Sequence, residues 1–352
     1  MNIQGTHIAP YPQEAMLIDC VPEMSGRRLL CTSPGLAQFA GAVTSASSQT
    51  EVTCTYLDLY RATLASEHWH AMPSNLHIRT ATDLPNGEAD IVAFPFSAGG
   101  EAELTRELIQ SGHERLISTG KMYAATDNPK DTWLHEQLRK VFRKVERRPR
   151  AEGVLYVGTK TDPLKKLKNF SCQFAFRDRG RLIAAYSRPG VFSHRHIDPG
   201  ARHLIEEMEF GSGARVLDIG CGAGVVALAA ACRGDDVTVH AVDSNTRAIQ
   251  CTEHGAQLNG LTNVTTELNA GGNYLHAGQY DLALANPPYY AGFRIARHFL
   301  TAGYDALRPG GIILIVTKRA DWYELHMPEL FDDVTVTERK GYYVFRGVRP
   351  DA

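Results

Sequence analysis

Short apolar runs alternate with helix-like stretches along most of the chain. In the C-terminal half, the predicted order is strand 216–219, helix 224–232, strand 237–242, helix 246–258, strand 281–285, helix 294–306 and strand 312–316. The predicted strands are rich in Val, Ile and Leu, which is typical of strands that are buried on both faces. Strands that alternate with helices in this way predict a parallel sheet with helices on both faces.

The same succession of runs occurs earlier in the chain, about 190 residues upstream. Four pairs of segments align: 28–35 with 215–222, 52–58 with 237–243, 90–96 with 281–287, and 116–121 with 313–318. Each copy then closes with one more strand, at 154–157 and at 342–345. Because the offsets differ only by loop-sized amounts, the pattern predicts a duplicated domain rather than a solenoid of short repeats.

The repeat sets the expected domain boundaries. We expect a first domain at 1–160, a linker at 161–190 and a second domain at 191–352. The predicted fold class is α/β, with two tandem doubly wound Rossmann-like domains. In the linker, Ser171–Phe176 and Arg181–Tyr186 alternate around Arg177–Gly180. This predicts a β-hairpin that joins or extends the domains.

Composition excludes several classes of protein. The 352 residues are 43% hydrophobic and 22% charged, which is ordinary for a globular protein of about two domains. The longest apolar run, Val225–Cys232, is far shorter than the roughly 20 residues that cross a membrane. Residues 1–25 lack the pattern of a secretory signal, so we expect a cytoplasmic protein. Seven cysteines without a CxxC pair suggest neither a disulfide framework nor a zinc site.

Positive charge is concentrated in one stretch although the net charge of the chain is only −2. Arg139–Arg195 contains sixteen Lys and Arg residues against four Asp and Glu residues, a formal charge of +12. Such a stretch is either a solvated face or a surface for a polyanion. The basic residues adjoin alternating aromatics that suit either RNA stacking or a core strand: Phe170, Phe174 and Phe176.

A glycine-rich loop follows the first predicted strand of the second copy. The strand 216–219 runs into Gly220, Gly222 and Gly224, and a helix begins directly afterwards. Such a loop lets a ligand approach the backbone at a helix start. Val225 stands where the dinucleotide fingerprint requires glycine, so NAD is disfavoured. Asp243 closes the next strand, where a carboxylate can accept ribose hydroxyls or cap a helix.

The third segment of the second copy ends in Asn286-Pro287-Pro288-Tyr289. Ligands bind at the carboxyl ends of the strands in this architecture. Since prolines have no backbone N–H, this end is rich in acceptors: the Asn286 side-chain oxygen and the Pro287 carbonyl, beside an aromatic ring from Tyr289. Two acceptors suit the two N–H groups of an exocyclic amine on a planar base or amide.

Together these motifs resemble the class I S-adenosylmethionine-dependent methyltransferases that act on amino groups. The duplication narrows the resemblance to the bacterial ribosomal RNA guanine-N2 methyltransferases, which carry a degenerate N-terminal domain and an active C-terminal one. Further support comes from 189–193 and from Asp198-Pro199-Gly200. The resemblance covers nearly the whole chain, although Tyr289-Tyr290 stands where the ribosomal family often has Phe and His.

The resemblance implies a set of cofactor-binding residues for S-adenosyl-L-methionine: Asp218, Gly220, Cys221, Gly222, Gly224, Asp243 and Asn269. Asp218 would approach the amino group, Asp243 would bind the ribose hydroxyls and Asn269 would contact the adenine ring. It also implies a catalytic set that holds and stacks the target base: Asn286, Pro287, Pro288 and Tyr289. No metal is required. Phe192 either covers the pocket mouth or belongs to the core.

The first copy lacks these motifs, with 32–37 in place of the glycine loop and Phe94-Pro95-Phe96-Ser97 in place of the Asn-Pro-Pro-Tyr motif. We therefore expect a scaffold for substrate recognition that binds no cofactor. The expected partner is ribosomal RNA or a ribosomal subunit, without a membrane, and the expected state is a monomer. Adenine-N6 methylation, protein glutamine-N5 methylation and a non-catalytic role in ribosome assembly remain alternatives.

Overall fold

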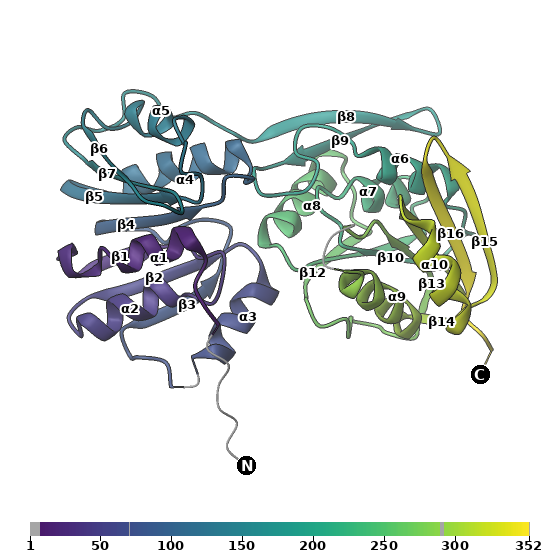
Figure 1. The fold of residues 1–352 in the computed structure, drawn as a ribbon. Helices are drawn as coiled ribbons and strands as arrows, with labels where there is room; N and C mark the ends of the chain where they lie inside the picture. The colour runs from purple at the N-terminus through teal and green to yellow at the C-terminus, as the bar shows by residue number, and fades with distance from the viewer. Residues whose placement is uncertain (1–7, 70, 289–291, 352) are drawn as a thin grey trace, which may run out of the picture. The chain divides into compact units, whose positions relative to one another are not determined.

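The computed structural model describes residues 8–69, 71–288 and 292–351. The chain divides into two compact units, Met1–Phe170 and Ser171–Ala352. Each unit is built around one seven-stranded sheet (Figure 1). In the part of the chain described, no helix is both long and apolar enough to span a membrane.

The first unit contains a sheet with strand order β3-β2-β1-β4-β5-β7-β6. Neighbouring strands from β3 to β5 pair in parallel, whereas β7 is antiparallel to both β5 and β6. The strands are β1 (Arg28–Cys31), β2 (Glu51–Tyr56), β3 (Leu76–Thr80), β4 (Ala89–Phe96), β5 (Leu116–Thr126), β6 (Val145–Pro149) and β7 (Val154–Thr159). The helices are α1 (Pro12–Ile18), η1 (Val21–Glu23), α2 (Gln38–Ala46), α3 (Leu59–His68), α4 (Ala102–Arg115) and α5 (Trp133–Arg139).

The second unit repeats that topology with the order β12-β11-β10-β13-β14-β16-β15, as the internal repeat predicts. Its strands are β10 (Arg215–Ile219), β11 (Thr238–Asp243), β12 (Val264–Leu268), β13 (Tyr280–Ala285), β14 (Leu307–Thr317), β15 (Asp332–Arg339) and β16 (Tyr342–Val348). Its helices are α6 (Pro199–Glu207), α7 (Val225–Ala231), α8 (Thr246–Leu258), α9 (Arg294–Ala306), α10 (Ala320–His326) and η2 (Met327–Glu329).

Helices cover both faces of each sheet, because the strands are apolar on both sides. In the second unit, α6, α7 and α8 bury their apolar residues in one cluster, and α9 and α10 contribute to the other. In the first unit, α1, α2 and α3 belong to one cluster, while α4 and α5 belong to the second. Both sheets are therefore α/β and doubly wound, as the alternation of strands and helices predicts.

The predicted hairpin is present as β8 (Cys172–Asp178) and β9 (Arg181–Ser187). It belongs to the second unit, whereas we expected a separate linker at 161–190. The reason is that Ile183 is fully buried in the cluster formed with α6, α7 and α8. In addition, the Ala184 N–H donates to Asn259 Oδ1 at 3.0 Å, and Asn259 Nδ2 donates to the Ala184 carbonyl at 2.7 Å. Phe176 is also buried there, so its ring is a core residue and not a surface for RNA stacking.

Part of the basic stretch lies on β6, an edge strand of the first sheet. Charged side chains on an edge strand hinder its pairing with another chain. Arg148 on this strand forms ion pairs with Glu23 and Glu146, at 2.7 and 2.8 Å. These contacts neutralise some of the excess positive charge locally.

Candidate active site

The three alternate glycines after β10 adopt left-handed backbone conformations, with φ of 74° at Gly220, 55° at Gly222 and 75° at Gly224. Residues with a side chain rarely adopt this region. A Cβ at Gly224 would also lie 2.7 Å from Thr252 Oγ1. At Gly222, by contrast, a Cβ would meet nothing nearer than the Phe192 carbonyl oxygen at 4.0 Å. The backbone conformation thus favours glycine at all three positions, and the loop is open beside Gly222.

The end of β11 holds this loop in place. The N–H of Cys221 donates to the Val242 carbonyl at 3.0 Å, and the N–H of Gly222 donates to Asp243 Oδ2 at 2.9 Å. Asp243 Oδ1 accepts a bond from the Asn245 N–H at 2.8 Å. A carboxylate has about four acceptor sites. Asp243 therefore holds both the glycine loop and the start of the segment that leads to α8.

Asp218 is a buried carboxylate beneath the loop, with an exposed fraction of 3%. Its Oδ2 accepts a hydrogen bond from the Ala227 N–H, in the first turn of α7, at 3.0 Å. Burial raises the pKa of Asp218 to about 7, against which the Ala227 hydrogen bond acts only in part. A cation placed beside it would favour the ionised form.

Cys221 is a packing residue of the same loop. Its sulfur accepts a hydrogen bond from Thr252 Oγ1 at 3.3 Å, and its exposed fraction is 6%. Burial raises the pKa of the thiol well above its usual range. The side chain is therefore a protonated thiol, although its backbone remains part of the pocket lining.

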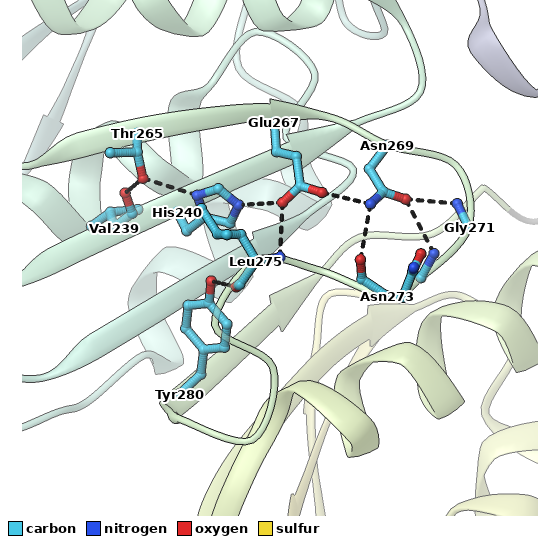
Figure 2. Close-up of polar contacts among 10 residues, drawn as sticks. Val239, His240, Thr265, Glu267, Asn269, Gly271, Asn273, Leu275 and Tyr280 are labelled. Carbon is cyan, nitrogen blue, oxygen red and sulfur yellow. Dashed lines mark hydrogen bonds and ion pairs between the residues drawn. The ribbon is translucent and has the colours of Figure 1, made fainter.

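Asn269 is held in a polar network at the end of β12, which Figure 2 shows. Its Nδ2 donates to Glu267 Oε1 at 2.6 Å and to the Asn273 carbonyl at 3.1 Å, and its Oδ1 accepts from the Gly271 N–H at 2.7 Å. Its own N–H donates to the Asp243 carbonyl at 3.0 Å. The Asn269 side chain thus shapes the loop after β12 and links it to the Asp243 strand.

Glu267 connects that loop to the buried His240 on β11 (Figure 2). Glu267 Oε2 lies 2.8 Å from His240 Nε2 and accepts from the Leu275 N–H at 3.0 Å. Burial by itself would raise the pKa of Glu267, but the hydrogen bonds from Asn269, Leu275 and His240 lower it. Glu267 is therefore an ionised support for the loop that carries Asn269.

Asn286 follows β13 and points its amide group toward α6. Its Nδ2 donates to Asp198 Oδ2 at 2.9 Å. Pro287 is buried and Pro288 is half-buried, so the Pro-Pro step is fixed against the unit. Tyr289, the predicted stacking residue, lies outside the described residues.

One pocket unites the glycine loop with Asn286. Its lining includes Phe192, Asp198, Asp218, Gly220, Gly222 and Asn286. Phe192 is 66% exposed, so it lies at the pocket edge and not in the core. The lining does not include Gly224, Asp243, Asn269 or Pro287.

Two supporting features were not predicted from the sequence. The first is the role of Asp198, whose segment Asp198-Pro199-Gly200 supports the family resemblance without assigning a role to this side chain. Asp198 lines the pocket and caps α6. An Asp before a Pro at the first helical position is a recognisable start signal for the helix. The second is a tether at the start of α8. Asn245 and Arg247 donate side-chain hydrogen bonds to the Gly190 and Pro189 carbonyls, both at 2.6 Å, and so hold the segment that leads to Phe192.

Sequence comparison places this site in a known family. Residues 183–346 match the model of the methyltransferase small domain. The Bacillus subtilis protein YbxB is 33% identical over 181 residues, which cover 49% of this chain and 89% of that protein. The chain belongs to the methyltransferase small-domain family. This membership confirms the predicted class I methyltransferase resemblance, and the matched range contains the whole pocket lining.

Longer relatives match the first unit as well. The Shewanella halifaxensis ribosomal RNA small subunit methyltransferase C is 28% identical over 299 residues, covering 80% of this chain and 86% of that protein. A solved T. thermophilus 16S rRNA guanine-N2 methyltransferase, in complex with AdoMet and guanosine, superposes with a TM-score of 0.80 at 21% identity. That match covers 98% of this chain and 94% of the other. It shows that the fold of both units is shared.

Proposed function

We propose that the chain transfers a methyl group from S-adenosyl-L-methionine to the exocyclic N2 amine of a guanine in ribosomal RNA. The observation that carries this proposal is the single pocket that contains both the glycine loop and Asn286. It sets an amide oxygen that can accept an amine N–H beside a loop suited to a nucleoside-like cofactor. The S. halifaxensis relative is a small-subunit ribosomal RNA methyltransferase, which supports ribosomal RNA as the substrate. The T. thermophilus enzyme is a 16S rRNA guanine-N2 methyltransferase, which supports guanine N2 as the target.

The pocket fits the proposed cofactor. The open space beside Gly222 leaves room for a ligand against the loop backbone. The proposed role of Asp218 is to face the cofactor's amino group, and that of Asp243 is to accept ribose hydroxyls. We expected the Asn269 side chain to contact the adenine ring directly. Because this side chain forms hydrogen bonds within its own loop, the proposed role of Asn269 is to hold the loop backbone that would contact the adenine.

Bound in this pocket, S-adenosylmethionine supplies an electrophilic methyl group. The chain's own residues then act on the amine. Asn286 Oδ1 and the Pro287 carbonyl would each accept one amine N–H, which aims the nitrogen lone pair at the methyl carbon. Catalysis by such positioning needs no covalent intermediate on the protein. The target base must be unpaired or flipped out, since a base inside a helix cannot enter a pocket.

The first unit would contribute substrate recognition as a scaffold. A ribosomal substrate implies that the enzyme acts in the cytoplasm on free RNA or on an assembled subunit.

The expected monomer remains a prediction, which light scattering of the purified chain would check.

The test is transfer of labelled methyl from S-adenosylmethionine to ribosomal RNA, free and in purified subunits, followed by nucleoside analysis. Label in N2-methylguanosine is the expected result. Label in N6-methyladenosine would replace guanine by adenine as the target. Label in protein alone, or none despite cofactor binding, would overturn the proposed function in favour of a glutamine amide or of a non-catalytic assembly role.

A further inference from the structure

The carboxylate of Asp198 contacts the Asn286 side chain directly. Asp198 Oδ2 accepts two hydrogen bonds, one from the Ala201 N–H at 3.0 Å and one from Asn286 Nδ2 at 2.9 Å. The first bond caps α6, and the second fixes which end of the Asn286 amide faces the carboxylate. Because an ionised carboxylate only accepts hydrogen bonds, it selects the Nδ2 end of the amide.

The other end of the amide lies where α6 has no side chain. An added Cβ at Gly200 would lie 3.1 Å from Asn286 Oδ1 and 2.8 Å from Asp198 Oδ2. Contacts of this length are tighter than ordinary van der Waals contacts. The glycine therefore leaves space for both oxygens at the start of α6.

From this geometry we propose that Asp198 is a positioning residue for methyl transfer: it orients the Asn286 amide so that Oδ1 accepts the target amine, and Gly200 keeps that orientation free of obstruction. This inference rests on the proposed function. An amide turned the other way would present N–H donors to the amine, and two sets of donors would face each other. Asp198 would thus act on the rate of transfer and not on binding of the cofactor.

The test uses Asp198→Ser, which keeps a good helix-capping residue but is too short to reach Asn286. We expect kcat to fall at least tenfold, while KM for RNA and the Kd of S-adenosylhomocysteine stay within twofold. The double variant Asp198→Ser/Asn286→Ala should be no slower than Asn286→Ala alone in single-turnover assays. Equal kcat for Asp198→Ser and wild type, or additive losses in the double variant, would overturn the proposal.

A second variant addresses the space beside the amide. Gly200→Ala lies inside a helix, where Ala is the better helix former, yet we expect it to lower kcat. The matched control is Gly211→Ala, because a Cβ at Gly211 would meet nothing within 4 Å and this residue lies beyond α6. A wild-type kcat for Gly200→Ala would contradict the orientation argument. If the wild-type enzyme itself methylates no guanine, the proposed function fails first and independently.

A different set of contacts joins half-buried aromatic rings to exposed cationic side chains. The rings of Phe293 and Trp322 stack with centroids 5.3 Å apart and 5° between their planes. The Arg319 guanidinium lies 5.3 Å from the Phe293 ring centre, and that of Arg297 lies 5.9 Å from Trp322. Lys318 Nζ lies 4.6 Å from the ring centre of Tyr342. We call Phe293, Arg297, Lys318, Arg319 and Trp322 the edge surface.

The edge surface lies at the same end of the sheet as Asn286. β14 pairs in parallel with β13, so Lys318 and Asn286 each follow the carboxyl end of one of two adjacent strands. The Tyr342 ring is also 3.3 Å from the added Cβ at Gly200 described above. Lys318, Arg319 and Arg297 are exposed, and Arg319 has an acidic neighbour in Asp321 at 3.6 Å.

We infer that the edge surface binds the phosphates of the single-stranded RNA that flanks the flipped-out base. Aromatic rings that support cationic side chains next to a base pocket suit an RNA backbone, which carries one negative charge per nucleotide. This inference also rests on the proposed function, but its readout is RNA binding and not methyl transfer.

The test compares two double variants by the salt dependence of affinity for a short, fluorescein-labelled single-stranded RNA of mixed sequence. Lys318→Ala/Arg319→Ala should lower the slope of log K against log salt concentration by about 1.4, since each lost contact with a single strand contributes roughly 0.7. Arg215→Ala/Arg308→Ala removes the same charge at the opposite end of the sheet and should leave the slope unchanged. Equal slopes for the two double variants would overturn the inference.

Discussion

The seven-stranded sheets of the two units share one strand order. The loop after β10 in the second unit is open, whereas the loop after β1 in the first unit is closed by side chains of its own unit. In the second unit this loop is open beside Gly222 and borders a pocket. In the first unit, Ser33 Oγ accepts the N–H groups of Gly35 and Ala37, at 3.0 and 3.2 Å, and donates to Glu14 Oε1 at 3.0 Å. Glu14 is fully buried, and burial raises the pKa of its carboxyl group.

More side chains close the first-unit loop from the other side. The hydroxyl of Tyr56 donates to the Gly35 carbonyl at 2.9 Å, and Trp69 Nε1 donates to the Leu36 carbonyl at 2.8 Å. The first-unit loop thus satisfies its backbone polar groups with its own chain, as buried polar groups require. The comparison teaches that the same strand order can carry either a loop that is closed by its own side chains or a loop that borders a pocket.

The largest difference between the two units is expected from substitutions just after β13 and β4, the fourth strand of each seven-stranded sheet in chain order. Asn286→Ala should lower methyl transfer by at least 10²-fold, the scale seen when one preorganised polar group is removed from an active site. Cofactor affinity, measured by calorimetry with S-adenosylhomocysteine, should be unchanged, since the proposed role of Asn286 is to bind the target amine and not the cofactor.

Ser97, exposed at the corresponding end of β4, offers the matched control. Ser97→Ala should keep wild-type transfer and cofactor affinity. Wild-type transfer by Asn286→Ala would refute the amine-pocket argument, and a large loss for Ser97→Ala would show that the first unit contributes directly to the reaction.

Asp243 and Asp58 are aligned in the internal repeat, at the end of β11 and just after β2, and give a smaller, two-sided test. Asp243→Ala should weaken S-adenosylhomocysteine binding by roughly 10- to 150-fold, because it removes charged hydrogen bonds worth about 1.5–3 kcal/mol. Asp58 caps α3 by accepting from the Arg61 N–H at 2.9 Å. Asp58→Ala should therefore cost about 1 kcal/mol of unfolding free energy without changing cofactor affinity.

Calorimetry and urea unfolding on both variants separate the two roles. If Asp58→Ala weakened cofactor binding as much as Asp243→Ala, the division of labour between the units would be wrong. If Asp243→Ala lowered the free energy of unfolding but left cofactor affinity unchanged, the role of Asp243 would be limited to holding the Gly222 loop.

Elements with a strong local signal were predictable from the sequence. The helices 246–258 and 294–306 occur with the predicted bounds, because each has an apolar face of helical period and clear ends. The strand predicted at 312–316 begins earlier, at Leu307. The buried Leu307 pairs with Tyr280, but the exposed Arg308 to Gly310 interrupt the register before Ile312 and carry no apolar pattern. The sequence therefore gives no local signal for this first part of the strand.

The parts of the candidate site that lie within short contiguous motifs were predictable from the sequence. The glycine loop and Asn286 meet in one pocket because parallel strands end at one edge of a sheet, a rule that sequence order alone can supply. Asp198 escaped prediction as a pocket residue because it lies 88 positions before its partner Asn286. No local pattern reports a hydrogen bond between side chains so far apart in the chain.

The smallest effect concerns pH and distinguishes Asp218 from its first-unit counterpart, the buried Cys31. Burial raises the pKa of Asp218 to about 7, so in the unliganded protein this carboxyl group is mostly protonated below pH 7 and ionised above it. The amino group of S-adenosylmethionine is a cation below pH of about 7.7 and prefers the ionised form. Cofactor affinity should therefore fall by up to tenfold for each pH unit below 7.

The measurement is the Kd of S-adenosylmethionine between about pH 5.5 and 7 for wild type and Asp218→Asn. The Asn side chain can still accept from the Ala227 N–H but does not titrate, so its affinity should be lower at pH 7 and independent of pH in this range. Cys31→Ser, changed at the counterpart position, should keep the wild-type pH profile. A wild-type slope retained by Asp218→Asn would assign the titration to another group and leave Asp218 as a support for α7 alone.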